Sequence, residues 1–167
     1  MSQPDRPAVG TQLHRIGWNT PAGLDEAMIR AVVEKFYARA RGDDVIGPVF
    51  KRVIPEAEWP AHLVKIADFW SSMLLGTGRF TGRPMPKHLA IPELSDAHFM
   101  RWLRLFRETV SEICPPEIAE LFIERSERIG NSFRMNIAMR RGEDIKQMGP
   151  LVREPAPSWS PPEDGKS

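Results

Sequence analysis

Hydrophobic residues recur at steps of three and four along most of this chain, and that spacing is typical of amphipathic α-helices. The clearest stripe consists of Trp59, His62, Leu63, Ile66, Phe69, Trp70, Met73 and Leu74. No stretch shows the sustained alternation of hydrophobic and polar residues that marks a half-buried strand. The sequence therefore predicts an all-α fold.

Three further segments with the helical period are predicted to be helices, namely residues 21–42, 95–114 and 117–141. The first is expected to start at Thr20 and Pro21, because threonine is a favourable cap and proline suits the first helical position. Its end is expected at Gly42 and the acidic pair that follows. A short interrupted segment, DVIGPVFKRV, comes next.

The 167 residues suit one domain, expected at residues 21–142 between two tails. Residues 1–20 are aperiodic and residues 143–167 are rich in proline, so we expect both to be poorly ordered. A formal net charge of +1 gives no global attraction to nucleic acid or anionic membranes. A single cysteine excludes an internal disulfide, and neither a signal peptide nor a membrane span is recognised. These features predict a cytoplasmic protein.

Four polar residues indicate a functional site. Tyr37, His62 and Trp102 lie on helix faces that are otherwise hydrophobic, while His88 lies in the segment PKHLAIP. A helix of ordinary length cannot cross these prolines, so the segment is short and stiff. A buried polar group without a partner costs about 1–3 kcal/mol. Each of the three helical residues alone is explained most simply by an internal hydrogen bond, but together they favour a shared site.

The spacing of the histidines and of Cys114 matches neither a zinc finger nor an H-E-x-x-H helix. The sequence carries no phosphate-binding loop, no dinucleotide fingerprint and no motif that places a base beside Cys114. A flat hydrophobic cofactor with one open metal position, such as haem, explains the arrangement better. It needs an aromatic slot and one imidazole ligand.

Three strings, FYARAR, HLVKIADFWSSMLLGTGRFTGRPMPKHLAIP and HFMRWLRLFRE, resemble the group III truncated haemoglobins. The specific combination is F-Y, H-x-x-K-x-x-x-F-W, M-x-x-H-L-x-[IL]-P and R-W-L, spread over about residues 25–141. Groups I and II usually carry Gly-Gly pairs, and this chain has none. The resemblance implies a truncated globin fold, a two-over-two helical sandwich around b-type haem.

The resemblance also implies roles for individual residues. His88 is the proximal iron ligand, and the distal residues are Tyr37, His62 and Trp102, of which His62 is also a candidate sixth ligand. Other residues expected at the cofactor are Phe50, Lys65, Ile66, Phe69, Trp70, Arg79, Phe80 and Leu89, with Lys65 and Arg79 pairing with the haem propionates. The chain departs from the family pattern at Phe80, where tyrosine is frequent, and at Pro86.

Three functional classes remain open. The first is reversible binding of O2, NO or another small haem ligand, with Tyr37 and Trp102 as hydrogen-bond donors. The second is redox catalysis, such as NO dioxygenation or a peroxidase-like reaction, which needs a separate reductase because the chain has no flavin or nicotinamide domain. The third is a helical bundle without a cofactor. We expect a monomer or weak dimer that binds neither nucleic acid nor membranes.

Overall fold

The computed structural model describes residues 20–82, 88 and 90–155. Within these residues it contains helices only, which confirms the all-α prediction. The α-helices are α2 (Glu26–Gly42), α3 (Gly47–Val53), α4 (Trp59–Leu75), α6 (Asp96–Ile113) and α7 (Pro116–Arg140). Two short 3-10 helices, η1 (Glu56–Glu58) and η2 (Ile145–Gln147), complete the described elements. None of the described helices is long and apolar enough to cross a membrane.

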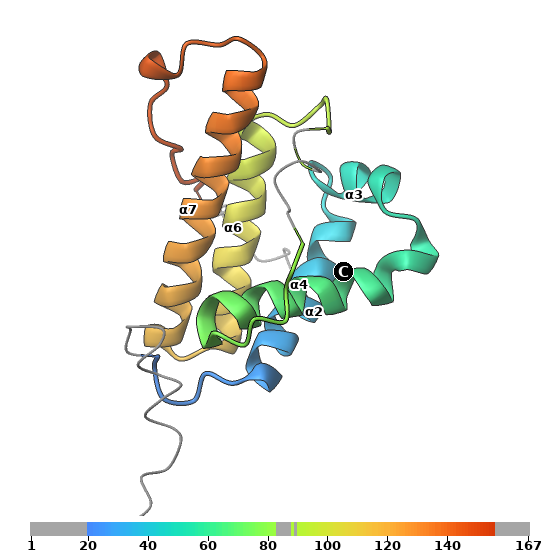
Figure 1. The fold of residues 1–167 in the computed structure, drawn as a ribbon, viewed down its shortest axis with the longest axis vertical. Coiled ribbons are helices and arrows are strands. Elements are labelled where there is room, and N and C mark those ends of the chain that lie inside the picture. Colours follow the sequence, from blue (N-terminus) through green and yellow to red (C-terminus); the bar gives the residue numbers. More distant parts are fainter. Residues whose placement is uncertain (1–19, 83–87, 89, 156–167) are drawn as a thin grey trace, which may run out of the picture.

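The four long helices form two packed pairs. Helix α6 runs alongside α7, and α2 packs against α4 (Figure 1). Helix α2 also packs on α6 and thereby joins the two pairs. The short helix α3 follows α2 directly and contacts it. This arrangement brings side chains of α2, α4 and α6 together.

The start of α2 corrects one prediction from the sequence. The cap is Asp25, whose side chain accepts a hydrogen bond of 2.9 Å from the Met28 N–H, and the helix begins at Glu26. The residues before it form a turn in which the Leu24 N–H donates to the Pro21 carbonyl at 3.3 Å. Gly23 permits this turn because it has a φ of +93°, which residues with a Cβ rarely adopt. The predicted end of the helix at Gly42 is confirmed.

The buried side chains form two clusters. The larger cluster lies among α2, α4, α6 and the start of α7, with Phe36, Phe106 and Phe122 almost fully buried. The smaller cluster comprises Leu94, Phe99 and Ile137, with four partly buried neighbours: Val49, Ile91, Phe133 and Leu151. The two clusters hold different parts of the predicted site, because His88 contacts Phe133 beside the smaller cluster, whereas Tyr37 belongs to the larger one.

The segment predicted as a C-terminal tail is packed in part. Ile145–Gln147 forms helix η2, capped by Asp144, whose side chain accepts from the Lys146 N–H at 3.0 Å. Beyond it, Leu151 packs into the smaller cluster and Glu154 pairs with arginines of α6. The expectation of poor order is therefore wrong for these residues, because ion pairs and apolar contacts offset the weak local propensity. Residues 1–19 and 156–167 lie outside the described part of the chain.

Candidate functional site

Tyr37 is the most deeply buried of the predicted polar site residues. It lies on α2 with 8% of its surface exposed, and its hydroxyl is hydrogen-bonded to the Trp102 side chain of α6. An indole nitrogen only donates, so the tyrosine oxygen is the acceptor of this bond. Burial raises the pKa of Tyr37 well above its ordinary value, and the Trp102 contact offsets only part of that rise. The hydroxyl therefore keeps its own proton at neutral pH and can donate it.

Trp102 is held in place by an aromatic stack. Its ring lies nearly parallel to that of Phe106, with centroids 5.2 Å apart and an interplanar angle of 5°. Phe106 in turn stacks on Trp70 of α4 at 5.2 Å and 12°. Phe36 meets Trp102 edge-on at 5.3 Å. Such contacts restrict the indole to one orientation, in which its N–H reaches Tyr37.

His62 and Phe50 complete the surroundings of Tyr37. The His62 ring, half-buried on α4, is 6.4 Å from the Tyr37 ring and 5.5 Å from that of Trp59. Phe50, half-buried on α3, meets Tyr37 edge-on at 5.6 Å. The structure thus brings together Tyr37, His62, Trp102 and Phe50, and their roles at a cofactor stay a prediction.

His88 contacts a different part of the protein. Its ring centroid is 4.6 Å from that of Phe133 on α7, with the planes tilted by 40°. The His88 carbonyl accepts from the Ile91 N–H at 3.1 Å and starts a turn toward Ser95, the N-cap of α6. His88 is half-buried. Ring contact and turn together fix the direction of the imidazole against the smaller cluster.

Several aromatic and aliphatic side chains that were expected at the cofactor or that contact the site residues retain accessible surface. They come from α3, α4, the loop after α4, α6 and α7, and each is half-buried: Phe50, Ile66, Phe69, Phe80, Trp102 and Phe133. Phe69 and Phe80 meet edge-on at 5.2 Å. Trp70, expected at the cofactor, instead lies in the core at 2% exposure. Half-buried apolar side chains, an imidazole and a buried hydroxyl donor are the residue types that fit a flat prosthetic group such as haem.

The two predicted partners for propionates lie in different settings. Arg79 forms an ion pair with Glu26 and donates to the Ser71 hydroxyl at 2.8 Å, so carboxylate and hydroxyl groups of this chain already surround it. Lys65 is exposed on α4. Leu89 lies outside the described residues. A propionate role for Arg79 or Lys65 stays a prediction.

Sequence reasoning missed three residues that shape this site. Phe133 contacts His88, Trp59 contacts both Tyr37 and His62, and Phe106 supports Trp102. All three lie on predicted hydrophobic stripes, so the helical period marks them as inward-facing. Periodicity does not reveal which partner an inward side chain meets. Trp59 is further covered by the Arg41 guanidinium, 4.4 Å from the ring centroid.

Comparisons with known proteins agree with this arrangement. A family model described as bacterial-like globin matches residues 21–134. The group 3 truncated hemoglobin ctb of Campylobacter jejuni is 34% identical over 113 residues, which cover 66% of this chain and 89% of that protein. A crystal structure of the group III truncated hemoglobin from Campylobacter jejuni matches with a TM-score of 0.66 at 30% identity, covering 71% of this chain and 95% of that one.

These matches confirm the resemblance and the truncated globin fold inferred from the sequence motifs. The family model spans more than half of the 167 residues, and the chain covers most of its curated relative. The chain therefore belongs to the bacterial-like globin family and, within it, to the group III truncated haemoglobins.

Proposed function

We propose that this protein binds b-type haem and uses it to bind O2 or another small diatomic ligand reversibly. Membership of the globin family implies haem binding. Covalent attachment of the c type uses a C-x-x-C-H motif, whereas this sequence has a single cysteine. Non-covalent binding is therefore the form that the chain supports.

The observation that carries the proposal is the burial of Tyr37 among aromatic side chains of α2, α3 and α4. Trp102 of α6 donates a hydrogen bond to the Tyr37 oxygen. This bond occupies an acceptor site of a buried hydroxyl and directs the hydroxyl proton elsewhere. When bound, haem supplies an iron with an open coordination position for a small ligand. The Tyr37 hydroxyl would donate a hydrogen bond to a partly negative ligand there, and this bond would slow ligand release.

The other site residues have supporting roles in this proposal. His88, whose ring contacts Phe133 beside the smaller cluster, would provide the imidazole that holds the haem iron. His62 is placed beside Tyr37 and Trp59, where its half-buried ring can regulate access to the ligand or donate to it. Trp59 and Phe50 pack against the Tyr37 ring, and burial raises the pKa of Tyr37, so its hydroxyl stays protonated.

Haem uptake by the purified protein tests the proposal. Titration with haemin is expected to give a Soret band for the native chain and to give a lost or shifted band for His88→Ala. His98→Ala is a matched control, because His98 caps α6 through its contacts with Ser95 and lies outside the proposed site. A His88→Ala protein that takes up haem with the native spectrum would contradict the assignment of the iron ligand.

A further inference from the structure

The polypeptide after helix η2 lies against α6 and α7. We call residues 149–155 the C-terminal strap. The Gly149 carbonyl accepts from Arg134 Nη1 at 2.7 Å, and Arg153 Nε donates to Glu127 Oε1 at 2.7 Å. The family model matches residues 21–134, so the strap lies beyond the residues that it matches.

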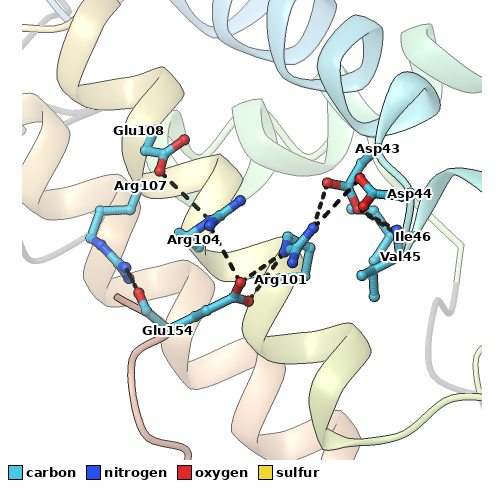
Figure 2. Close-up of polar contacts among 9 residues, drawn as sticks. All are labelled: Asp43, Asp44, Val45, Ile46, Arg101, Arg104, Arg107, Glu108 and Glu154. Carbon is cyan, nitrogen blue, oxygen red and sulfur yellow. Dashed lines mark hydrogen bonds and ion pairs between the residues drawn. The ribbon is translucent and has the colours of Figure 1, made fainter. Parts of the chain in front are cut away.

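Glu154 connects the strap to three arginines on successive turns of α6 (Figure 2). Its carboxylate accepts from Arg101 Nε at 2.9 and 3.2 Å and pairs with Arg104 Nη1 at 3.3 Å. The Glu154 carbonyl accepts from Arg107 Nη2 at 3.1 Å. These side chains of Glu154, Arg101 and Arg104 are only 23%, 19% and 11% exposed, so water screens their attraction less than it screens surface pairs.

Arg101 extends the connection to the turn between α2 and α3. Its Nη1 donates to Asp43 Oδ1 at 2.9 Å, and the Asp43 side chain is 7% exposed. The other carboxylate oxygen of Asp43 accepts from the N–H groups of Val45 and Ile46 at 2.9 and 3.0 Å. Burial alone would raise the pKa of Asp43, but hydrogen bonds from Ile46, Arg101 and Val45 outweigh it and lower the pKa. The carboxylate is thus charged and held on both sides.

This chain of contacts joins the helices that carry Tyr37 and Trp102. The Asp43 turn follows α2, which carries Tyr37, and leads into α3, which carries Phe50. Arg101 is the immediate neighbour of Trp102 on α6. A guanidinium that binds Asp43 and Glu154 together therefore ties α6 to the end of α2, in addition to the contacts of Phe36 with Trp102 and Phe106. Phe36 of α2 contacts both the Tyr37 ring and the Trp102 ring, so a change in how α6 meets α2 would change the geometry between Tyr37 and Trp102.

We propose that Glu154 is a positioning residue: through Arg101 and Asp43 it holds α6 against the α2–α3 turn and so maintains the hydrogen bond between Trp102 and Tyr37. The proposal rests on the function proposed above for those two residues. It assigns part of the control of ligand release to a C-terminal segment that lies outside the residues matched by the family model. Loss of the Glu154 charge is expected to loosen the donor pair without removing any side chain of the site.

Two measurements on the full-length protein as purified test this proposal. Tyr37 is the only tyrosine in the sequence, so tyrosine isotope-labelled at the ring carbon that bears the hydroxyl gives one NMR signal. That signal responds to hydrogen bonding at the Tyr37 oxygen. Amide hydrogen exchange at Val45 and Ile46 reports the Asp43 turn, because both amides donate to the Asp43 carboxylate.

Glu154→Gln is expected to shift the Tyr37 signal and to speed exchange at Val45 and Ile46 about tenfold, because a neutral amide binds a guanidinium far more weakly than a carboxylate does. Arg101→Lys should act similarly, since an ammonium lacks the planar fork that holds two carboxylates. The matched control is Glu127→Gln, which removes the α7 carboxylate that pairs with Arg153 of the strap. It should leave both measurements at their native values.

Two results would overturn the proposal. In the first, Glu154→Gln and Arg101→Lys both leave the Tyr37 signal native, and any faster exchange is confined to the strap. In the second, Glu127→Gln shifts the signal as much as Glu154→Gln, which would show that attachment of the strap in general matters and Glu154 in particular does not. Neither measurement reads haem uptake or ligand release, so failure of the haem-uptake experiment and failure of this one are separate results.

Discussion

Replacing Tyr37 by phenylalanine gives the sharpest prediction about the site. The substitution keeps the ring, and with it the edge-on contacts to Phe36 at 4.7 Å and to Phe50 at 5.6 Å, and removes only the hydroxyl. Tyr37 is 8% exposed, so water cannot readily replace that group. The change therefore isolates one donor in the proposed pocket.

The magnitude follows from the strength of one buried hydrogen bond. A donor bond to a partly charged ligand contributes about 1.5–3 kcal/mol, which corresponds to roughly 10- to 150-fold faster release of oxygen from the ferrous protein. Trp102→Phe should have a smaller effect, about 2- to 10-fold, because it removes only the support given to the Tyr37 oxygen. The matching association rates are expected to change little.

A double-mutant cycle measured by stopped-flow oxygen release tests this reasoning. If Trp102 acts through Tyr37, the double variant should release oxygen as fast as Tyr37→Phe alone, because phenylalanine has no oxygen to accept the hydrogen bond from Trp102. Multiplication of the two single effects would show that Trp102 donates to the ligand directly. Unchanged release in Tyr37→Phe would refute the assignment of Tyr37 as the donor.

Three further predictions concern the scaffold. Phe106→Ala should lower the free energy of unfolding in urea by about 3–5 kcal/mol, because this 1% exposed ring lies between Trp70 and Trp102; a loss below about 1 kcal/mol would contradict its central place. Asp43→Asn should destabilise the protein at neutral pH. The pKa of Asp43 in the folded protein lies below its ordinary value of 3.8, so the charged carboxylate stabilises the fold at pH values above 3.8. The difference in unfolding free energy between the native protein and Asp43→Asn should therefore shrink as the pH falls through the lowered pKa. A constant difference across acidic pH would argue against this contribution. Cys114 should react slowly with a disulfide reagent at neutral pH, because burial raises its pKa to about 11 and only 7% of the residue is exposed. Rapid reaction in the native state would contradict that burial.

Local patterns were sufficient for the helices because each helix forms its backbone hydrogen bonds within its own segment. The hydrophobic period of residues 59–74 predicted α4, and Gly42 marked the end of α2. The same reasoning failed at the start of α2, where Thr20 and Asp25 both suit a cap and only the turn at Gly23 selects Asp25. Capping preference is a local property, but the choice between two candidates depends on where the preceding chain must go.

At the site, too, local patterns identified the candidate residues, whereas their partners depended on tertiary packing. The polar residues Tyr37, His62 and Trp102 were conspicuous on hydrophobic stripes, and the prolines around His88 predicted a short stiff segment. The motifs then identified the family, which the comparisons confirmed. None of these patterns predicted that Trp102 donates to Tyr37 or that Phe133 contacts His88. Those pairs join different helices, and helical periodicity carries no information on which helices meet.

The sequence alone determined the helical class, the helix-forming segments and the residues able to bind an iron or donate a proton, because these depend on side-chain chemistry and on spacing along one chain. The tertiary structure decided the partners of those residues, and it attached the strap through Glu154 and Arg101 where composition indicated a loose tail. The physical reason is that an ion pair between residues 53 positions apart depends on how α6, α2 and the C-terminal segment pack together.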